Sequence, residues 1–139
     1  MTAARARPTR RGRAPGTFLD RDRLIAVAAD LADTDGWDGL TLSRVAEAVD
    51  RHVSSLYTHV DGLDALRLEI AKTAVDELAD EVWRAALGRT GADALAAIAG
   101  VEFSWARAHP GRVAAIHDHS ASTDDDELAD EVWRAALGQ

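Results

Sequence analysis

Residues 39–66 read GLTLSRVAEAVDRHVSSLYTHVDGLDAL, and this stretch decides the fold. Thr41 is a good N-cap for a short helix, because its hydroxyl can accept a hydrogen bond from an unpaired backbone N–H. The apolar face of this helix is formed by Leu42, Val45, Ala46 and Val49. A break at residues 50–52 leads to a second short helix at residues 53–59. Leu56 faces inward in this helix, and so does Val60, which comes just after it. Two short helices joined by a three-residue turn predict a helix-turn-helix.

A helix before this unit is predicted over residues 21–35, where apolar residues recur at helical spacing. Asp20 can cap its first turn, and Gly36 can supply the left-handed residue that ends it. Trp37 and Leu40 are apolar enough to bury the connecting loop against the core.

Three helices are predicted after the helix-turn-helix. A long one runs from an Asp61 cap to Gly88, and the next covers residues 92–108. The apolar stripe of that fifth helix is Leu95, Ile98, Val101 and Trp105. Pro110 can open a short sixth helix, and residues 118–125 are polar and acidic, which predicts a loop. We therefore expect an all-α fold.

The charge of the chain is strongly polarised. The net charge is -8, yet residues 1–23 hold seven arginines against two aspartates, a balance of +5 that leaves -13 for the remainder. The arm at residues 2–16 is too polar to fold alone. It would be drawn to phosphate, although a solvated tail without a partner has the same composition.

The composition excludes several classes of function. The chain has no cysteine, so disulfides, thiolate metal sites and sulfur nucleophiles are ruled out. It contains no phosphate-binding loop and no catalytic constellation, so we expect neither an enzyme nor a cofactor. No apolar run approaches the roughly 20 residues of a membrane span, which favours a cytoplasmic protein without a membrane partner.

The quoted stretch resembles the DNA-binding signature of the TetR (tetracycline repressor) family. That signature joins a threonine-capped helix with a buried alanine, here Thr41 and Ala46, to a Leu-Tyr-x-His recognition helix, here Leu56, Tyr57 and His59. An acidic helix follows in both, and the likeness covers residues 17–70. The Ala-His-Pro-Gly corner at residues 108–111 is similar to a helix boundary in one branch of the family.

The resemblance implies a transcriptional regulator, in most cases a repressor released by a small-molecule inducer. Ser54, Ser55 and Thr58 are small and polar, as a helix entering the major groove requires. Tyr57 and His59 would bind phosphates, as in the family. The predicted DNA-binding set is Thr41, Ser43, Arg44, His52, Val53, Ser54, Ser55, Tyr57, Thr58 and His59. Within it, Thr41 would offer a helix N-terminus to a phosphate, and Arg44 could reach a guanine or a phosphate.

The turn departs from the family pattern, which has glycine, an apolar residue and a polar cap where this chain has Asp50, Arg51 and His52. Aspartate enters the left-handed region at modest cost. A buried unpaired guanidinium would be expensive, so either Arg51 reaches solvent or Val53 fills the space between the helices. Leu63 replaces the usual lysine at the start of the fourth helix.

Two other readings compete with DNA binding. A metal site could use His109, His117 and His119 with Asp118 and the acids at residues 124–126. An interaction module could instead use the amphipathic helices that carry Trp83 and Trp133, although core packing of these tryptophans is the preferred interpretation.

One segment occurs twice. Residues 76–88, DELADEVWRAALG, recur letter for letter as residues 126–138, which favours recent duplication over a repeat architecture. The copy carries the same apolar residues, so it could compete with the original for one groove, within a chain or by exchange between two chains. Its equivalent pairs are Leu128 and Leu78, Val132 and Val82, Trp133 and Trp83, and Ala136 and Ala86.

We expect three parts: a basic disordered arm at residues 1–20, a helix-turn-helix domain at 21–66, and a truncated regulatory and dimerisation region at 67–139. The partners implied are an operator in double-stranded DNA and an inducer of unknown identity. The family's homodimer is doubtful here, because the copied segment stands where the dimer helices would follow. A defective remnant without operator binding is therefore the alternative.

Overall fold

Six helices make up the computed structural model, which describes residues 18–122 and has no strand in that range. They are α1 Arg21–Asp35, α2 Leu42–Ala48, α3 Val53–Leu56, α4 Leu63–Ala86, α5 Gly91–Ala108 and α6 Pro110–Ser122. The all-α prediction is confirmed. The arginine arm and the copied segment lie outside the described residues. No helix within residues 18–122 has both the length and the apolar content of a membrane span.

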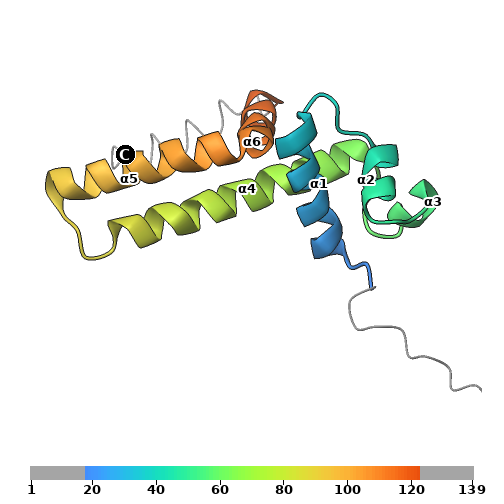
Figure 1. The fold of residues 1–139 in the computed structure, drawn as a ribbon, viewed down its shortest axis with the longest axis horizontal. Helices are drawn as coiled ribbons and strands as arrows, with labels where there is room; N and C mark the ends of the chain where they lie inside the picture. The colour runs from blue at the N-terminus through green and yellow to red at the C-terminus, as the bar shows by residue number, and fades with distance from the viewer. Residues whose placement is uncertain (1–17, 123–139) are drawn as a thin grey trace, which may run out of the picture.

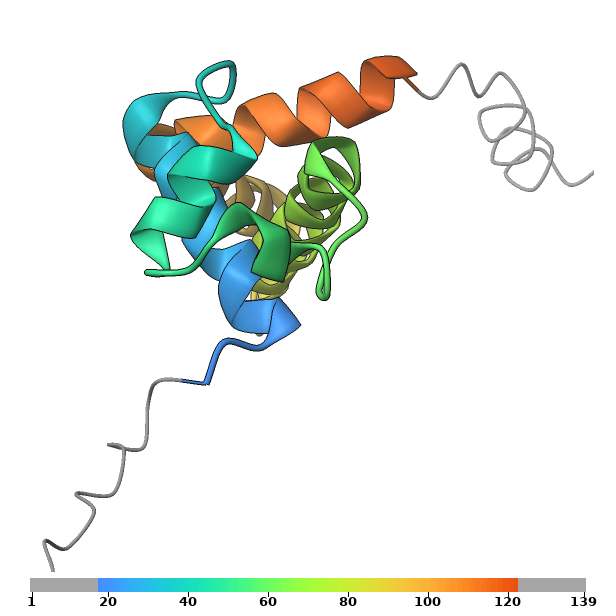
Figure 2. The same ribbon diagram turned by 90° about the vertical axis from the view of Figure 1, so that its right-hand side faces the viewer.

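The molecule consists of a head and a stalk (Figure 1). The head is formed by α1, α2, α3 and the first turns of α4, and the stalk by the rest of α4 with α5 packed along it. Helix α6 crosses both α1 and α4 where the two parts meet (Figure 2). The head, α4 and α6 therefore share one core.

The core of the head forms as the apolar spacing predicts. Its largest fully buried side chains are Leu24, Val45, Leu56, Leu66 and Ile70. Trp37 and Leu40 are also buried, which confirms that the loop after α1 packs inward. Burying a leucine or valine side chain contributes about 1.5–3 kcal/mol, so five such residues fix how α1, α2, α3 and α4 sit against one another.

The predicted N-caps are confirmed for two helices and wrong for a third. The Asp20 carboxylate accepts from the Arg23 backbone N at 2.7 Å, and the Thr41 hydroxyl accepts from the Arg44 backbone N at 3.2 Å. Asp61 does not cap α4. Gly62 occupies that position with φ 152°, a conformation that favours glycine, so the chain turns one residue later than expected.

Helix α3 is shorter than predicted, because it ends at Leu56 and residues 57–59 form turns. The Ser55 hydroxyl donates to the His52 carbonyl and the Thr58 hydroxyl to the Ser55 carbonyl, each at 2.8 Å. Such local side-chain bonds compete with a helical ladder. Helix α3 is therefore a single helical turn followed by hydrogen-bonded turns.

Helix α6 is longer than predicted, since it continues to Ser122 through residues expected to form a loop. The Trp37 indole Nε1 donates to the Asp118 carboxylate at 3.3 Å, and the Ser120 hydroxyl donates to the Ile116 carbonyl at 2.8 Å. The polar residues of this segment are thus used in contacts compatible with a helix.

Gly111 allows α6 to approach α1. A Cβ at this position would lie 2.1 Å from the carbonyl carbon of Ala32 and 2.3 Å from its oxygen. The two backbones can meet this closely only where one residue lacks a side chain. The glycine of the Ala-His-Pro-Gly corner is therefore a packing requirement.

The stalk leaves much apolar surface open. Along α5 only Trp105 is buried, and Leu95, predicted on the same stripe, is 70% exposed. On α4, Trp83 is 68% exposed, so the preferred prediction of core packing is wrong for this tryptophan. A helix such as α5, with apolar residues on several sides, normally packs against neighbours on those sides.

Candidate nucleic-acid interface

The turn between α2 and α3 is built around Asp50, which has a φ of 54°. The Arg51 backbone N closes it by donating to the Ala46 carbonyl at 2.9 Å. Arg51 itself is exposed and its guanidinium donates to the Asp50 carbonyl at 3.0 Å, while Val53 packs against the core. Two alternatives were predicted for the departure from the family pattern, an Arg51 that reaches solvent and a Val53 that fills the space between the helices. Both are present together.

Replacing Asp50 with glycine is expected to raise the free energy of unfolding by about 0.5–1 kcal/mol, because glycine adopts a positive φ without steric cost. Replacing the exposed Arg51 with valine should change it by less than about 0.5 kcal/mol. Urea denaturation measures both. A lower midpoint for Asp50→Gly would mean that the aspartate side chain stabilises the turn.

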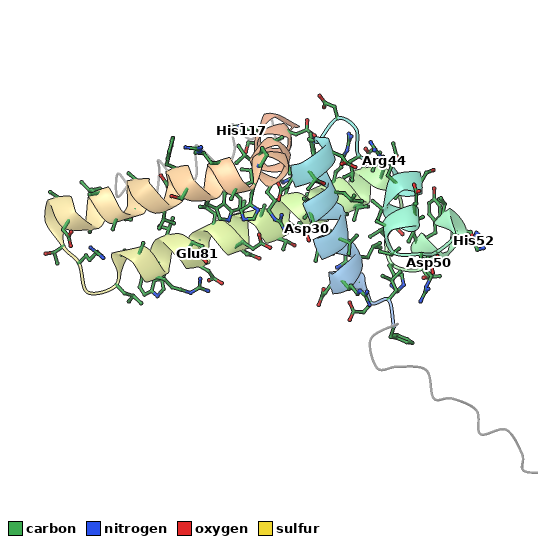
Figure 3. All side chains as sticks on the ribbon, viewed as in Figure 1. Asp30, Arg44, Asp50, His52, Glu81 and His117 are labelled. Atoms are coloured by element: carbon green, nitrogen blue, oxygen red, sulfur yellow. The ribbon has the colours of Figure 1, made fainter. Side chains whose placement is uncertain are left out.

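The predicted DNA-binding residues lie on one end of the head, around α2, the turn and α3. Figure 3 shows Arg44, Asp50 and His52 there, with His52 at the outer tip. The exposed members of the set are Thr41, Ser43, Arg44, His52, Ser54, Tyr57 and Thr58, and the half-buried members are Val53, Ser55 and His59. Tyr57 is 55% exposed. The set thus shares one surface, with three members set deeper in it.

Ser55, which was expected to face outward, is half-buried, and its hydroxyl donates to the His52 carbonyl. The hydroxyl of Thr58 is also donated inward, although Thr58 is exposed. A hydroxyl that donates in this way keeps its lone pairs as acceptors. The exposed side chains of α3 and its extension are Ser54, Tyr57 and Thr58.

Arg44 is held above α2 by the last residue of α1. Its Nη2 lies 3.3 Å from the Asp35 Oδ2, and both side chains are partly exposed. An ion pair this accessible to water contributes little stability. The guanidinium could therefore exchange Asp35 for a phosphate at small cost.

The N-terminal end of α1 lies beside this surface, which sequence reasoning did not foresee. The Arg21 Nε donates to the His59 carbonyl at 3.2 Å, and its Nη2 lies 3.3 Å from the Glu69 Oε1. Phe18, just before α1, is 89% exposed. The arginine arm is therefore attached next to the turn that follows α3.

Carboxylates border the same surface. A groove of about 330 Å³ at the α2–α3 turn is lined by Glu47, Asp50, Arg51, His52 and Ser55. Since phosphates would be repelled from the Glu47 and Asp50 side of this groove, a DNA backbone would pass on the Tyr57 side, nearer to Arg21.

A buried charge cluster joins α6 to the head, and no sequence motif marked it. Arg112 is 6% exposed and pairs with Asp33 and Asp30 of α1 and with Glu77 of α4. Burial alone would lower the pKa of Arg112, but the hydrogen bond to Asp30 and the charges of Glu77 and Asp33 outweigh it and raise that pKa. The guanidinium stays charged and ties three helices together.

Two of the residues proposed for a metal site, His109 and Asp118, have other partners. The His109 Nδ1 lies 3.0 Å from the Asp33 Oδ2, and Asp118 binds Trp37. Residues 18–122 contain no group of three potential ligands placed to hold an ion; the acids at residues 124–126 lie outside the described residues. Within the described range, the metal hypothesis has no support.

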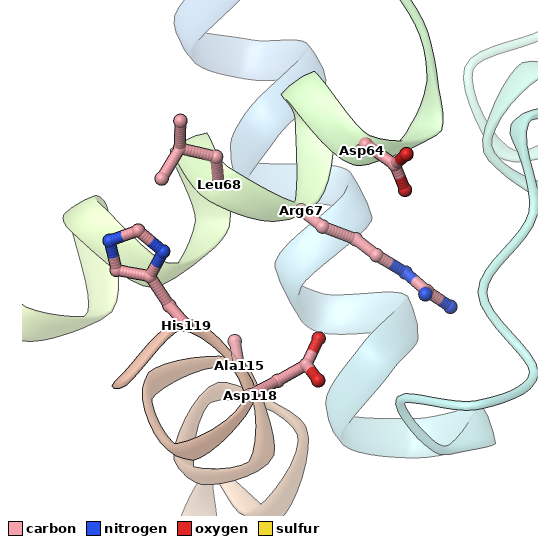
Figure 4. A pocket seen from close by; sticks show the side chains of 6 residues that line it. All are labelled: Asp64, Arg67, Leu68, Ala115, Asp118 and His119. Carbon is pink, nitrogen blue, oxygen red and sulfur yellow. The ribbon is translucent and has the colours of Figure 1, made fainter. Parts of the chain in front are cut away.

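A second contact between α6 and the head lies near the start of α4. Figure 4 shows Arg67 of α4 facing Asp118 of α6 across a small groove of about 180 Å³. The Arg67 guanidinium lies 5.1 Å from the Trp37 ring centroid and donates to the Trp37 carbonyl at 3.4 Å. Since Asp118 also accepts from the Trp37 indole, α6 is held to the head here as well as at the Arg112 cluster.

The stalk contains a larger groove between α4 and α5, of about 770 Å³. Small and apolar side chains line most of it, including Ala85, Gly100 and Val101. Glu81 and Arg89 supply charge, and Trp105 and His109 lie toward the end nearest α6. A groove of this size and lining can accept a small apolar molecule.

Comparison with known proteins gives relatives of one kind. The chain is 35% identical over 97 residues to the HTH-type transcriptional regulator Rv0681 of Mycobacterium tuberculosis, covering 70% of this chain and 44% of that protein. It is 29% identical to the HTH-type transcriptional regulator YobS of Bacillus subtilis over 75% of this chain and 56% of that protein. It is 33% identical to the HTH-type transcriptional repressor DrrR1 of Streptomyces coeruleorubidus over 63% of this chain and 34% of the repressor.

The chain spans about half the length, or less, of these curated relatives. No family model matches it. Among solved structures, the crystal structure of "Probable transcriptional regulatory protein RHA5900" superposes with a TM-score of 0.56 and 23% identity, covering 83% of this chain and 65% of that one. The described helices therefore share the fold of that protein.

Proposed function

We propose that this chain is a DNA-binding transcriptional regulator of the TetR type, and that it represses transcription from an operator in double-stranded DNA. The observation that carries the proposal is the exposed polar surface of α2, the turn and α3, which includes Ser54, Tyr57 and Thr58. The names of the relatives, one of them a repressor, support the same function.

In this proposal, Ser54 and Thr58 face base edges in the major groove, where small polar side chains let the backbone come close. Tyr57, His59 and Arg44 bind phosphates on either side and fix the register. The arm delivers its arginines from beside His59, which adds affinity that does not depend on sequence.

We further propose that a small molecule in the α4–α5 groove relieves repression. The groove ends at Trp105 and His109, and His109 contacts the Asp33 that Arg112 also holds. A ligand that moved His109 would therefore act on the contact between α6 and α1. Only differential binding to two arrangements of that contact would change DNA affinity.

Gel-shift titrations of duplex DNA from upstream of the coding region test the DNA-binding part. Deleting residues 2–16 removes five arginines, which should lower affinity and flatten the salt slope by up to about 4. Tyr57→Ala should weaken binding to all sequences alike, by roughly 5- to 10-fold.

Phe103→Ala is the matched control, because Phe103 is an aromatic residue of α5 with similar exposure, at 65%. It should leave DNA binding unchanged. If neither the deletion nor Tyr57→Ala alters binding to any duplex, the proposed contact surface is incorrect.

A further inference from the structure

Helix α4 carries an apolar ridge on the side that α5 leaves uncovered. Val75, Ala79, Trp83 and Leu87 are spaced by four residues and so form one line along the helix. We call this line the α4 ridge. Val75 is 49% exposed, Trp83 68% and Leu87 59%. The parallel line through Leu78, Val82 and Ala85 is half-buried, on the side of α5.

The copied segment carries three of the four ridge residues, since the counterpart of Val75 is Asp125. Residues 126–138 repeat residues 76–88, so Ala129, Trp133 and Leu137 correspond to Ala79, Trp83 and Leu87. In both copies the two apolar lines together cover more than half of the circumference, which is more than one neighbouring helix can bury. The sequence of α4 thus requires a second neighbour, and the chain contains a segment with the matching pattern.

The end of α6, from which the chain leads to the copied segment, lies close to the start of the ridge. The end of α6 and the start of the ridge line one groove of about 340 Å³, to which α6 contributes Ile116, His119 and Ser120 and α4 contributes Val75 and Asp76. Three residues separate the end of α6 from residue 126, and they reach at most about 14 Å. The linker is therefore long enough for the copied segment to begin at the start of the ridge.

The same reach argues against the α4–α5 groove within one chain. That groove approaches α6 at His109, and the 13 residues of α6 place its far end roughly 20 Å from there. The linker is too short to bridge this distance. The copied segment therefore cannot begin in the α4–α5 groove of its own chain.

We propose that residues 126–138 dock as a helix on the α4 ridge of the same chain, parallel to α4 and in register with residues 76–88. The tether sets the direction, because both segments start at the α6 end. Lys72 also lines the shared groove and pairs with Glu69 at 3.4 Å in an exposed ion pair, so its charge could be shared with the acids at residues 124–126. Register places Asp80 beside Asp130, and this repulsion is weakened by salt.

Disulfide trapping tests the proposal in the full chain, which has no cysteine of its own. The test pair is Ala79→Cys with Ala129→Cys. The control pair is Arg84→Cys with Ala129→Cys, since Arg84 lies roughly 140° around α4 from Ala79. The test pair should oxidise within one chain at least about tenfold faster than the control, at a rate independent of protein concentration, and faster at roughly 0.5 M than at 0.05 M salt.

Adding Trp83→Ser to the test pair separates docking from chance collision of a tethered segment. Trp83 is largely exposed, so the fold should survive, which circular dichroism checks, and the rate should fall to that of the control pair. Equal rates for the two pairs would overturn the proposal. A disulfide that joins two chains would overturn it as well, because it would show exchange between copies.

Discussion

Replacing Arg112 with methionine is expected to lower the free energy of unfolding by about 3–5 kcal/mol, because the buried Asp33 carboxylate loses its guanidinium and keeps only His109 and the backbone N of residue 112. The side chains of Arg112 and Asp33 are 8% and 9% exposed, so water solvates neither charge well. The substitution also removes the Arg112 contacts to Asp30 and Glu77, at 3.0 Å each. Urea denaturation followed by circular dichroism measures the loss.

Arg107→Met is the matched control, since Arg107 is exposed on α5 and its guanidinium lies 5.7 Å from the Phe103 ring centroid. This control should cost less than about 0.5 kcal/mol. Adding Asp33→Asn to Arg112→Met should recover part of the loss, because the buried group is then neutral. A loss for Arg112→Met no larger than that of the control would contradict the role assigned to the cluster.

Local sequence signals predicted most of the head. The spacing of Leu24, Val45 and Leu66 identified the buried faces, and Asp20 and Thr41 marked two helix starts correctly. The errors arose where a neighbour decides the outcome. Helix α6 continues past residue 118 because Asp118 binds Trp37, 81 positions earlier in the chain, and no local pattern contains that contact.

The sequence predicted which residues make up the candidate site, but not how deeply each is buried or which other residues lie beside it. Helical spacing suggested that Ser55 faces outward, whereas a bond to its own turn draws it inward. The role of Arg21 beside His59 could not be foreseen, because it joins residues 38 apart. The Arg112 cluster was missed for the same reason. An arginine after Pro-Gly has no sequence feature that distinguishes a buried pair from a solvated charge.

Replacing Ser54 with glutamate is expected to lower affinity for duplex DNA by about 100-fold or more, because like charges brought together at an interface cost several kcal/mol. Ser54 is exposed on α3, so a glutamate there has room and the head should keep its stability. The added carboxylate would face the negative potential of the groove and its phosphates.

Ser120→Glu makes the same change in charge at an exposed serine of α6, outside the head. Binding of a labelled duplex by the full chain, Ser54→Glu and Ser120→Glu, at one fixed salt concentration, is the most direct test of DNA recognition by α3. We expect Ser54→Glu to bind about 100-fold more weakly or worse, while Ser120→Glu stays within about twofold of the unsubstituted chain. Equal affinities for the two variants would contradict recognition by α3.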